Sequence, residues 1–287
     1  MKVLMIGASG LVGTALFEDL QKKGDTVFRL SRDSKTRELP SDPAHYENMD
    51  AVVNLAGENI ASGRWTATKK QKILESRVLT TKTLCQILSS LKNPPKVLIN
   101  ASAVGFYGDR GDELLTEDSS AGNNFLADVC QKWEAAASVL DPSKTRVVLL
   151  RTGTVLSAKG GALAKMLPAF KLGIGGMLGS GKQYFSFITL SDLCKVILFA
   201  IENQDLGGVI NAVTPYPINN KEFTKTLGTL LHRPTFFKIP AFAIRLLFGE
   251  MGNELLLSST RAYPAQLLSA GFHFDYPTIH EALQSCL

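Results

Sequence analysis

The stretch MKVLMIGASGLVGTALFEDLQKKG, residues 1–24, decides the fold of this chain. Its apolar run Lys2–Ile6 predicts a short β-strand that ends directly at a glycine. Further along, Leu16 and Leu20 stand four residues apart, the spacing that puts two side chains on one face of a helix. Gly24 stands where the C-terminus of a helix favours glycine. The stretch therefore predicts a strand, a tight turn and a helix in immediate succession.

Strand and helix patterns continue to alternate beyond this stretch. Thr26–Leu30 predicts a second strand, which completes a strand–helix–strand unit. Such alternation is typical of a parallel sheet with helices on both faces. We therefore expect the α/β class with a doubly wound parallel sheet. The further predicted strands are Ala51–Leu55, Val97–Ala101, Arg146–Leu150 and Gly208–Val213, and the long predicted helices are Lys69–Leu91 and Asn124–Leu140.

Three glycines share the first turn, in the spacing Gly7-x-x-Gly10-x-x-Gly13. Backbone N–H groups at a helix N-terminus bind the pyrophosphate of a dinucleotide, and side chains there would block its approach. We assign Gly7 to the turn, Gly10 to the close approach of the ligand and Gly13 to the packing of helix on strand. A glycine-rich turn without a ligand is the alternative, but the position between a strand and an amphipathic helix favours a dinucleotide. The cofactor-binding residues predicted here are Gly7, Ser9, Gly10, Leu11, Val12 and Gly13.

The end of the second strand bears on the choice of cofactor. An acidic residue at this position would accept the ribose hydroxyls of NAD, but the chain has Ser31 followed by Arg32. A hydroxyl and a guanidinium suit the additional 2′-phosphate of NADP, because guanidinium binds phosphate through two parallel hydrogen bonds. Asp33 is the competing residue and would favour NAD. We expect NADP(H) rather than NAD(H), with Ser31 and Arg32 in the cofactor site.

The sequence pattern changes after Arg151, which follows the fifth predicted strand. LGIGGMLGSGK at 172–182 is rich in glycine and predicts a loop rather than a regular element. We expect a loop over about 157–187 that borders a substrate cleft. The predicted division is a nucleotide-binding domain over 1–215 and a smaller α-rich lobe on the substrate side over 216–287.

Composition excludes several classes of protein. Hydrophobic residues make up 45% of the chain and charged residues 20%, as in ordinary globular proteins rather than disordered ones. The apolar run Val196–Ile201 falls far short of the roughly 20 residues of a membrane span. The formal net charge is only +5 and forms no basic stripe, so a nucleic-acid partner is not expected. We expect a cytoplasmic monomer or homodimer that binds a small-molecule substrate, without nucleic acid or membrane partners.

Neither a metal site nor a disulfide is expected. The cysteines Cys85, Cys130, Cys194 and Cys286 are far apart and show no CxxC pairing. The four histidines are scattered and form no HExxH motif.

Longer motifs resemble those of the short-chain dehydrogenase/reductase superfamily, in its extended, epimerase-like branch. NLAGENI at Asn54–Ile60 and SAVGFYG at Ser102–Gly108 carry this resemblance, together with the glycine turn. The chain is further similar to sugar-nucleotide-epimerase-like proteins with a small C-terminal domain of unknown function. The resemblance covers nearly the whole chain and implies an NADP-binding Rossmann domain. The motifs of this narrower group are RW at 64–65, SR at 76–77, WE at 133–134, LRTGTVL at 150–156, GGMLGSGKQYFSFITLSDL at 175–193, GEMG at 249–252 and AYPAQLLSAGFHFDYP at 262–277.

The resemblance also implies a path for the cofactor. The residues that follow the third predicted strand would run past the adenosine, and Ala101 would lie near the nicotinamide. The cofactor-binding residues predicted on this basis are Leu55, Ala56, Gly57, Glu58, Ala101 and Arg151.

One departure from the family pattern concerns catalysis. Extended members carry a Tyr-x-x-x-Lys dyad in which tyrosine is the general acid/base and lysine lowers its pKa and holds the nicotinamide ribose. When the chain is aligned on Glu134, Leu126 stands at the tyrosine position and Cys130 at the lysine position. The usual acid/base pair is therefore missing.

Ser102 and Tyr107 are the predicted catalytic substitutes, with Glu58 and Arg151 as further candidates. Tyr107 could instead be an aromatic residue packed under the cofactor. The expected function is an NADP(H)-binding epimerase or oxidoreductase that acts on a hydroxyl or carbonyl of a small substrate, such as a nucleotide sugar. The alternative is an NADPH-binding sensor or scaffold with reduced catalysis.

Overall fold

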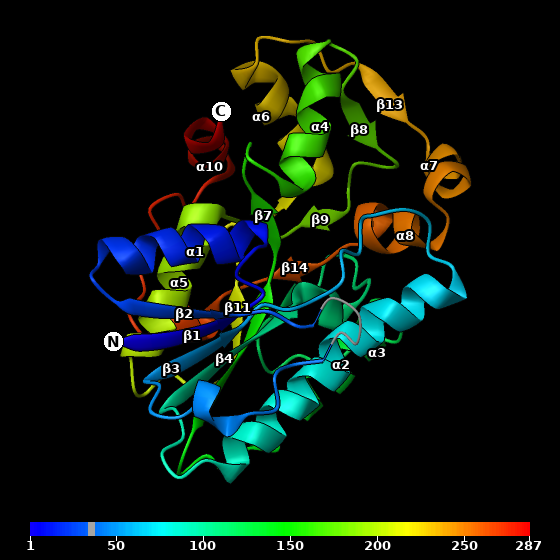
Figure 1. Cartoon of the computed structure of the whole chain (residues 1–287). Coiled ribbons are helices and arrows are strands. Elements are labelled where there is room, and N and C mark those ends of the chain that lie inside the picture. Colours follow the sequence, from blue (N-terminus) through cyan, green and yellow to red (C-terminus); the bar gives the residue numbers. More distant parts are fainter. Residues whose placement is uncertain (34–37) are drawn as a thin grey trace.

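The computed structural model describes residues 1–33 and 38–287 (Figure 1). Its centre is a six-stranded sheet in the order β11-β6-β4-β3-β1-β2, and all neighbouring strands run parallel. The chain moves from β1 to β2 on one side and then through β3 and β4 on the other, so the predicted doubly wound α/β fold is confirmed. The strands are β1 (Lys2–Ile6), β2 (Thr26–Leu30), β3 (Ala51–Asn54), β4 (Val97–Ala103), β6 (Arg146–Thr152) and β11 (Gly208–Ala212).

Two pairs of helices cover the sheet (Figure 1). Helices α1 (Leu11–Lys22) and α5 (Leu190–Glu202) pack against one face. Helices α2 (Ala67–Ser90) and α3 (Phe125–Ala137) pack together against the other. Both faces of the sheet are therefore buried, as in other parallel sheets.

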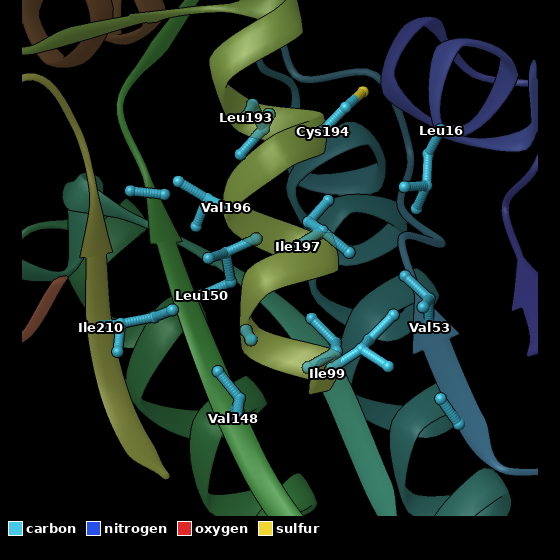
Figure 2. Packing of buried hydrophobic residues seen from close by; sticks show 14 of the residues in the cluster. Leu16, Val53, Ile99, Val148, Leu150, Leu193, Cys194, Val196, Ile197 and Ile210 are labelled. Carbon is cyan, nitrogen blue, oxygen red and sulfur yellow. The ribbon is translucent and has the colours of Figure 1, made fainter. Parts of the chain in front are cut away.

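Strand residues alternate between the two cores because successive side chains point to opposite faces. Met5 belongs to the cluster under α1 and α5, and Leu4 to the cluster under α2. Figure 2 shows the first cluster, in which Leu16 of α1 and Ile197 of α5 lie over Val53 and neighbouring strand residues.

A C-terminal lobe of short elements adjoins the sheet (Figure 1). Its apolar cluster joins Leu163 of α4, Phe223 of α6 and Leu283 of α10. This cluster includes residues from both sides of position 215, and the domain boundary there stays a prediction. The remaining elements are the strands β5 (Leu114–Leu115), β7 (Thr154–Leu156), β8 (Gly176–Leu178), β9 (Tyr184–Phe185), β10 (Phe187–Thr189), β12 (Ile218–Asn219), β13 (Phe237–Ile239) and β14 (Arg261–Ala262), the helices α4 (Gly161–Lys171), α6 (Asn220–Leu230), α7 (Ala241–Phe248), α8 (Glu250–Gly252), α9 (Ala265–Ser269) and α10 (Ile279–Cys286), the 3₁₀ turns Pro43–His45 and Val104–Tyr107 and the π-helical turn Asn253–Leu257.

The prediction of a loop over 157–187 is wrong. The segment contains helix α4 and the strands β8 and β9. Strand β8 pairs in parallel with β13, and a Cβ atom at Gly176 would collide with the carbonyl oxygen of Phe237. Glycine here permits close strand pairing rather than marking a turn. The sequence does not predict α4 because Gly160 precedes the helix and Pro168 lies inside it. Both residue types usually indicate a loop rather than a helix.

Replacing Leu16 by alanine should lower the free energy of unfolding by about 2–5 kcal/mol, because a fully buried side chain leaves a cavity. Leu79→Ala is the matched control, since Leu79 is 56% exposed and its removal should cost well under about 1 kcal/mol. Urea denaturation measures both variants. Equal losses would contradict the packing described for α1.

Candidate dinucleotide-binding site

The turn between β1 and α1 is packed so tightly that two of its glycines are structurally required. Gly7 has a φ of +83°, and a Cβ atom there would lie 2.7 Å from the carbonyl carbon of Leu55. A Cβ atom at Gly13 would lie 2.5 Å from the carbonyl oxygen of Gly7. Gly10 differs, because it is exposed and a Cβ atom there would meet only the Gly7 carbonyl oxygen, at 3.5 Å. Protein packing does not require glycine at position 10, whereas the close approach of a ligand would.

The N-terminus of α1 is suited to an anion. Gly10 is the N-cap residue, no side chain caps the helix, and its first turn contains no acidic residue. The free N–H groups and the helix dipole together favour a phosphate at this position. Leu11 and Val12 are partly exposed in this first turn. The residues present therefore fit a pyrophosphate group.

Arg32 lies beyond the end of β2 and contacts α2. Its Nη1 donates to the carbonyl oxygen of Ser76 and to Thr80 Oγ1, both at 3.5 Å. Ser31 is exposed beside it, and the backbone N–H of Asp33 donates to the Glu38 carbonyl oxygen at 2.8 Å. The structure thus brings Ser31 and Arg32 to the same edge of the sheet as the glycine turn, since β1 and β2 are neighbours.

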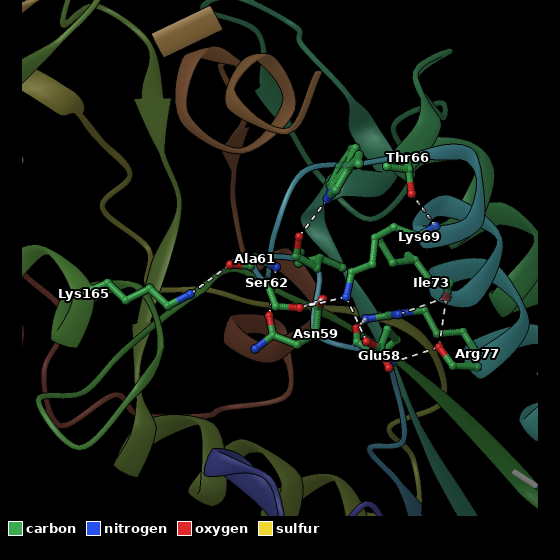
Figure 3. Close-up of polar contacts among 12 residues, drawn as sticks. Glu58, Asn59, Ala61, Ser62, Thr66, Lys69, Ile73, Arg77 and Lys165 are labelled. Atoms are coloured by element: carbon green, nitrogen blue, oxygen red, sulfur yellow. Dashed lines mark hydrogen bonds and ion pairs between the residues drawn. The ribbon is translucent and has the colours of Figure 1, made fainter. Parts of the chain in front are cut away.

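Helix α2 holds the turn that follows β3 (Figure 3). The backbone N–H of Glu58 donates to Ser76 Oγ at 2.9 Å, and its carboxylate accepts from Lys69 Nζ at 2.8 Å. Arg77 Nη2 donates to the Glu58 carbonyl oxygen at 3.1 Å. From α4, Lys165 Nζ donates to the carbonyl oxygen of Ala61 at 3.0 Å. The predicted cofactor residues Leu55, Ala56, Gly57 and Glu58 therefore lie in an anchored turn.

Ser102 and Arg151 belong to a buried ionic network rather than to the exposed rim. In register, Ser102 of β4 is paired with Arg151 of β6, which is paired with Asn211 of β11. The carboxylate of Glu134 accepts from Arg151 Nε at 2.9 Å, from Arg151 Nη2 at 2.8 Å and from Ser102 Oγ at 2.6 Å. The Arg151 and Glu134 side chains are only 4% and 9% exposed. Ala101 precedes Ser102 and is partly exposed.

Tyr107 completes this network from the 3₁₀ turn after β4. Its side chain is fully buried, and its hydroxyl accepts from Arg151 Nη1 at 3.0 Å. The same hydroxyl lies 2.8 Å from Asn211 Oδ1 and 3.0 Å from the Thr116 carbonyl oxygen, to which it can donate. Burial raises the pKa of the phenol, so Tyr107 remains protonated at neutral pH.

The two dyad positions on α3 are apolar in character. Leu126 packs near Gly105, where a Cβ atom would lie 3.3 Å from Leu126 Cβ. Cys130 is 3% exposed, and burial raises the pKa of its thiol to about 11, so the thiol is uncharged at neutral pH. Helix α3 thus presents neither a phenol nor an ammonium group at these positions.

Sequence reasoning did not find the partners of the network. Glu134 is visible in the WE motif, but its contact with Arg151 depends on how α3 packs against β6. Asn211 and Glu117 carry no local signal, although Glu117 Oε1 accepts the backbone N–H groups of Asn211 and Gln266 at 3.0 and 3.2 Å.

Residues 1–33 and 38–287 contain neither a candidate membrane span nor a cluster of metal ligands. None of the helices there combines the length and apolar character needed to cross a membrane. No group of three or more His, Cys, Asp or Glu residues gathers there as metal ligands.

The parallel sheet, the open glycine turn and the adjoining strand ends define a Rossmann-type protein of the short-chain dehydrogenase/reductase kind. The model of the NAD dependent epimerase/dehydratase family matches residues 3–212, and a domain of unknown function, DUF1731, matches residues 239–286. The chain belongs to the NAD dependent epimerase/dehydratase family.

Three relatives illustrate this membership. The epimerase family protein MT2273 of Mycobacterium tuberculosis is 43% identical over 98% of this chain and 96% of its own length. The crystal structure of the human epimerase family protein SDR39U1 with NADPH is 35% identical, with a TM-score of 0.93 over 100% of this chain and 99% of that one. A nucleoside-diphosphate sugar epimerase from Corynebacterium glutamicum is 36% identical, with a TM-score of 0.81 over 100% of this chain and 58% of that one.

Replacing Glu134 by glutamine should lower the free energy of unfolding by about 3–5 kcal/mol, because the buried Arg151 charge then lacks its counter-ion. Glu113→Gln is the matched control. Glu113 also accepts two hydrogen bonds from one arginine, Arg110, but it is 48% exposed and its loss should cost no more than about 1 kcal/mol. Denaturant titration measures the free energy of unfolding of both variants. Similar small losses would show that the ion pair between Glu134 and Arg151 does not stabilise the fold as described.

Proposed function

We propose that this protein binds NADP(H) and catalyses oxidation or reduction at a hydroxyl or carbonyl carbon of a small substrate, as in an epimerase or reductase. The observation that carries the proposal is the exposed backbone of Gly10 at the uncapped N-terminus of α1. Arg32, held against α2 beyond the end of β2, supports the choice of NADP. The NADPH in the crystal structure of human SDR39U1 supports it further.

The chain's own residues would bind the cofactor in three regions. The amides of the glycine turn would hold the pyrophosphate, and Ser31 and Arg32 would hold the 2′-phosphate. Leu55, Ala56 and Gly57 would line the adenosine side, with Ala101 near the nicotinamide. The nicotinamide ring, when bound, supplies a hydride donor or acceptor.

We further propose different roles for Ser102 and Tyr107. Ser102 stands one residue before the end of β4, is largely buried and donates its hydroxyl proton to Glu134; it is our candidate for the group that exchanges a proton with substrate. The hydroxyl of Tyr107 is surrounded by Arg151, Asn211 and the Thr116 carbonyl. We therefore assign Tyr107, together with Arg151, to positioning rather than to proton transfer. The name of the Corynebacterium glutamicum relative supports a nucleotide-sugar substrate.

A second candidate function is an NADPH sensor or scaffold without turnover. The replacement of the family dyad by Leu126 and a neutral, buried Cys130 favours it. The two candidates share the cofactor site and differ only in whether NADPH is consumed.

Arg32→Ala should weaken NADPH binding by about 10- to 100-fold and leave NADH binding little changed, because only NADPH carries the 2′-phosphate. Arg29→Ala removes the same charge from β2, where Arg29 lies over the ring of Phe17, and is the matched control. Calorimetric titration measures the affinity of each variant for NADPH and for NADH. Equal losses for NADPH and NADH in the Arg32 variant would contradict the assignment.

Incubation of the protein with NADPH and a panel of carbonyl compounds, including nucleotide-linked keto sugars, should show loss of the absorbance of the reduced nicotinamide. Ser102→Ala should then lower turnover by about 10²–10⁴-fold without changing NADPH affinity. Tyr107→Phe should lower the free energy of unfolding by about 1–3 kcal/mol. Its effect on turnover should be much smaller than that of Ser102→Ala. A Tyr107→Phe loss of turnover as large as that of Ser102→Ala would return proton transfer to Tyr107. Tight NADPH binding with no turnover on any compound would favour the sensor.

A further inference from the structure

Helix α7 exposes most of its apolar side chains. Its eight residues, AFAIRLLF, include one charged residue, Arg245, and only the Ile244 side chain is buried. Phe242 and Leu246 stand one helical turn apart and are 70% and 72% exposed, and Leu247 is 62% exposed. A helix that is apolar on all sides is normally covered by protein or by lipid. The packing of this chain therefore does not explain the sequence of α7.

Neighbouring segments extend the apolar surface of α7, which lies at the outer edge of the C-terminal lobe (Figure 1). Strand β13 leads into α7, and Phe236 directly before β13 is 85% exposed. The segment after α4 adjoins β13, because β8 pairs with β13 and Arg233 Nε donates to the Lys171 carbonyl oxygen at 2.7 Å. We call the exposed apolar residues of these segments the apolar patch. It consists of Leu172, Ile174, Phe236, Phe242, Leu246 and Leu247.

Contacts with the turn after β3 and with α2 hold α7 in this exposed position. Arg64 from that turn donates to the carbonyl oxygens of Leu246 and Leu247 at the end of α7. Lys70 of α2 pairs with Glu250, two residues after α7, at 2.8 Å. The exposure of the patch is thus a property of the folded chain.

Basic residues surround the apolar patch. The segments 157–187 and 216–249, which carry the patch and the elements around it, have nine Lys and Arg residues and one acidic residue, Glu222. The whole chain has a formal net charge of only +5, so its positive charge is concentrated here. The exposed cations within three residues of a patch residue are Lys171, Arg233, Lys238 and Arg245.

This combination fits an anionic membrane surface better than a protein partner. Phe and Leu side chains enter the boundary between headgroups and acyl chains, and Lys and Arg are attracted to anionic headgroups. Protein interfaces are depleted in lysine, whereas seven of the nine cations here are lysines. A second copy of the chain would bring like charges against each other, which opposes association.

We propose that the apolar patch inserts into the surface of an anionic membrane, with the surrounding cations at the lipid headgroups. Binding of this kind is peripheral, because an eight-residue helix lies in the interface and is far too short to span the bilayer. The expectation from sequence that there is no membrane partner rested on the absence of a long apolar run. A short surface helix is not detected by that criterion. The proposal does not depend on the proposed cofactor function.

Sedimentation of the full chain with large vesicles tests the proposal. Vesicles of phosphatidylcholine with about 30% phosphatidylglycerol should bind the protein at least about 10-fold more tightly than vesicles of phosphatidylcholine alone. Raising the salt concentration from about 0.1 M to about 0.5 M should weaken this binding, because salt screens the attraction between the cations and the lipid.

Variants of the patch identify the part of the chain that binds. The double variant Phe242→Ala, Leu246→Ala should bind the anionic vesicles about 10- to 100-fold more weakly, because two side chains no longer enter the lipid. Leu79→Ala is the matched control, since Leu79 is an exposed leucine on α2 and its removal should leave vesicle binding unchanged. Both replaced side chains of the double variant are exposed, so thermal melting should show that it folds like the wild-type protein.

A second pair of variants tests the role of charge. Arg245→Gln should weaken binding to the anionic vesicles by about 5-fold. Lys132→Gln removes an exposed cation from α3 and should have little effect.

The proposal is overturned if the anionic vesicles do not bind the wild-type protein, or bind it no more tightly than neutral vesicles. It is also overturned if the double variant binds as tightly as the wild-type protein, or if Leu79→Ala weakens binding equally. Sedimentation velocity without lipid detects the main alternative. A dimer that the double variant loses, in a protein that vesicles do not bind, would assign the patch to a second copy of the chain.

Discussion

The packing of α1 onto the end of β1 is the constraint on which the site depends. Gly13 lies so close to the preceding turn that a Cβ atom would lie 2.5 Å from the Gly7 carbonyl oxygen, and a Cβ atom at Gly7 would lie 2.7 Å from Leu55 in the turn after β3. This contact fixes the N-terminus of α1 beside the end of β3, at the point in the sheet where the direction of winding reverses. The helix end, the end of β2 and the turn after β3 then share one edge.

A buried ionic network connects the ends of β4, β6 and β11 with helix α3. Arg151 joins β6 to Glu134 of α3 and to Tyr107, while Asn211 extends the network to β11. A buried pair of this kind costs desolvation energy and is stable only when its hydrogen bonds are well satisfied. Here each nitrogen of the guanidinium has a partner, so the network fixes the ends of β4, β6 and β11 relative to one another.

The parallel sheet could be predicted from the sequence because its signals are local. The bounds of β1 and β2 agree with the prediction to the residue, since apolar runs there end at glycine or polar residues. Helix α4 could not be predicted, because Gly160 and Pro168 are residue types that usually indicate a loop. The glycine turn and Arg32 could be selected as candidates, whereas the pairing of Arg151 with Glu134 and the position of Arg77 depend on how α2 and α3 pack.

A crystal structure of the protein with NADPH tests the central claim most directly. The account predicts the pyrophosphate over Gly10 at the N-terminus of α1, the 2′-phosphate at Arg32 and the nicotinamide half on the β4 side of β1. A cofactor bound elsewhere, or a pyrophosphate that does not contact the glycine turn, would contradict the account.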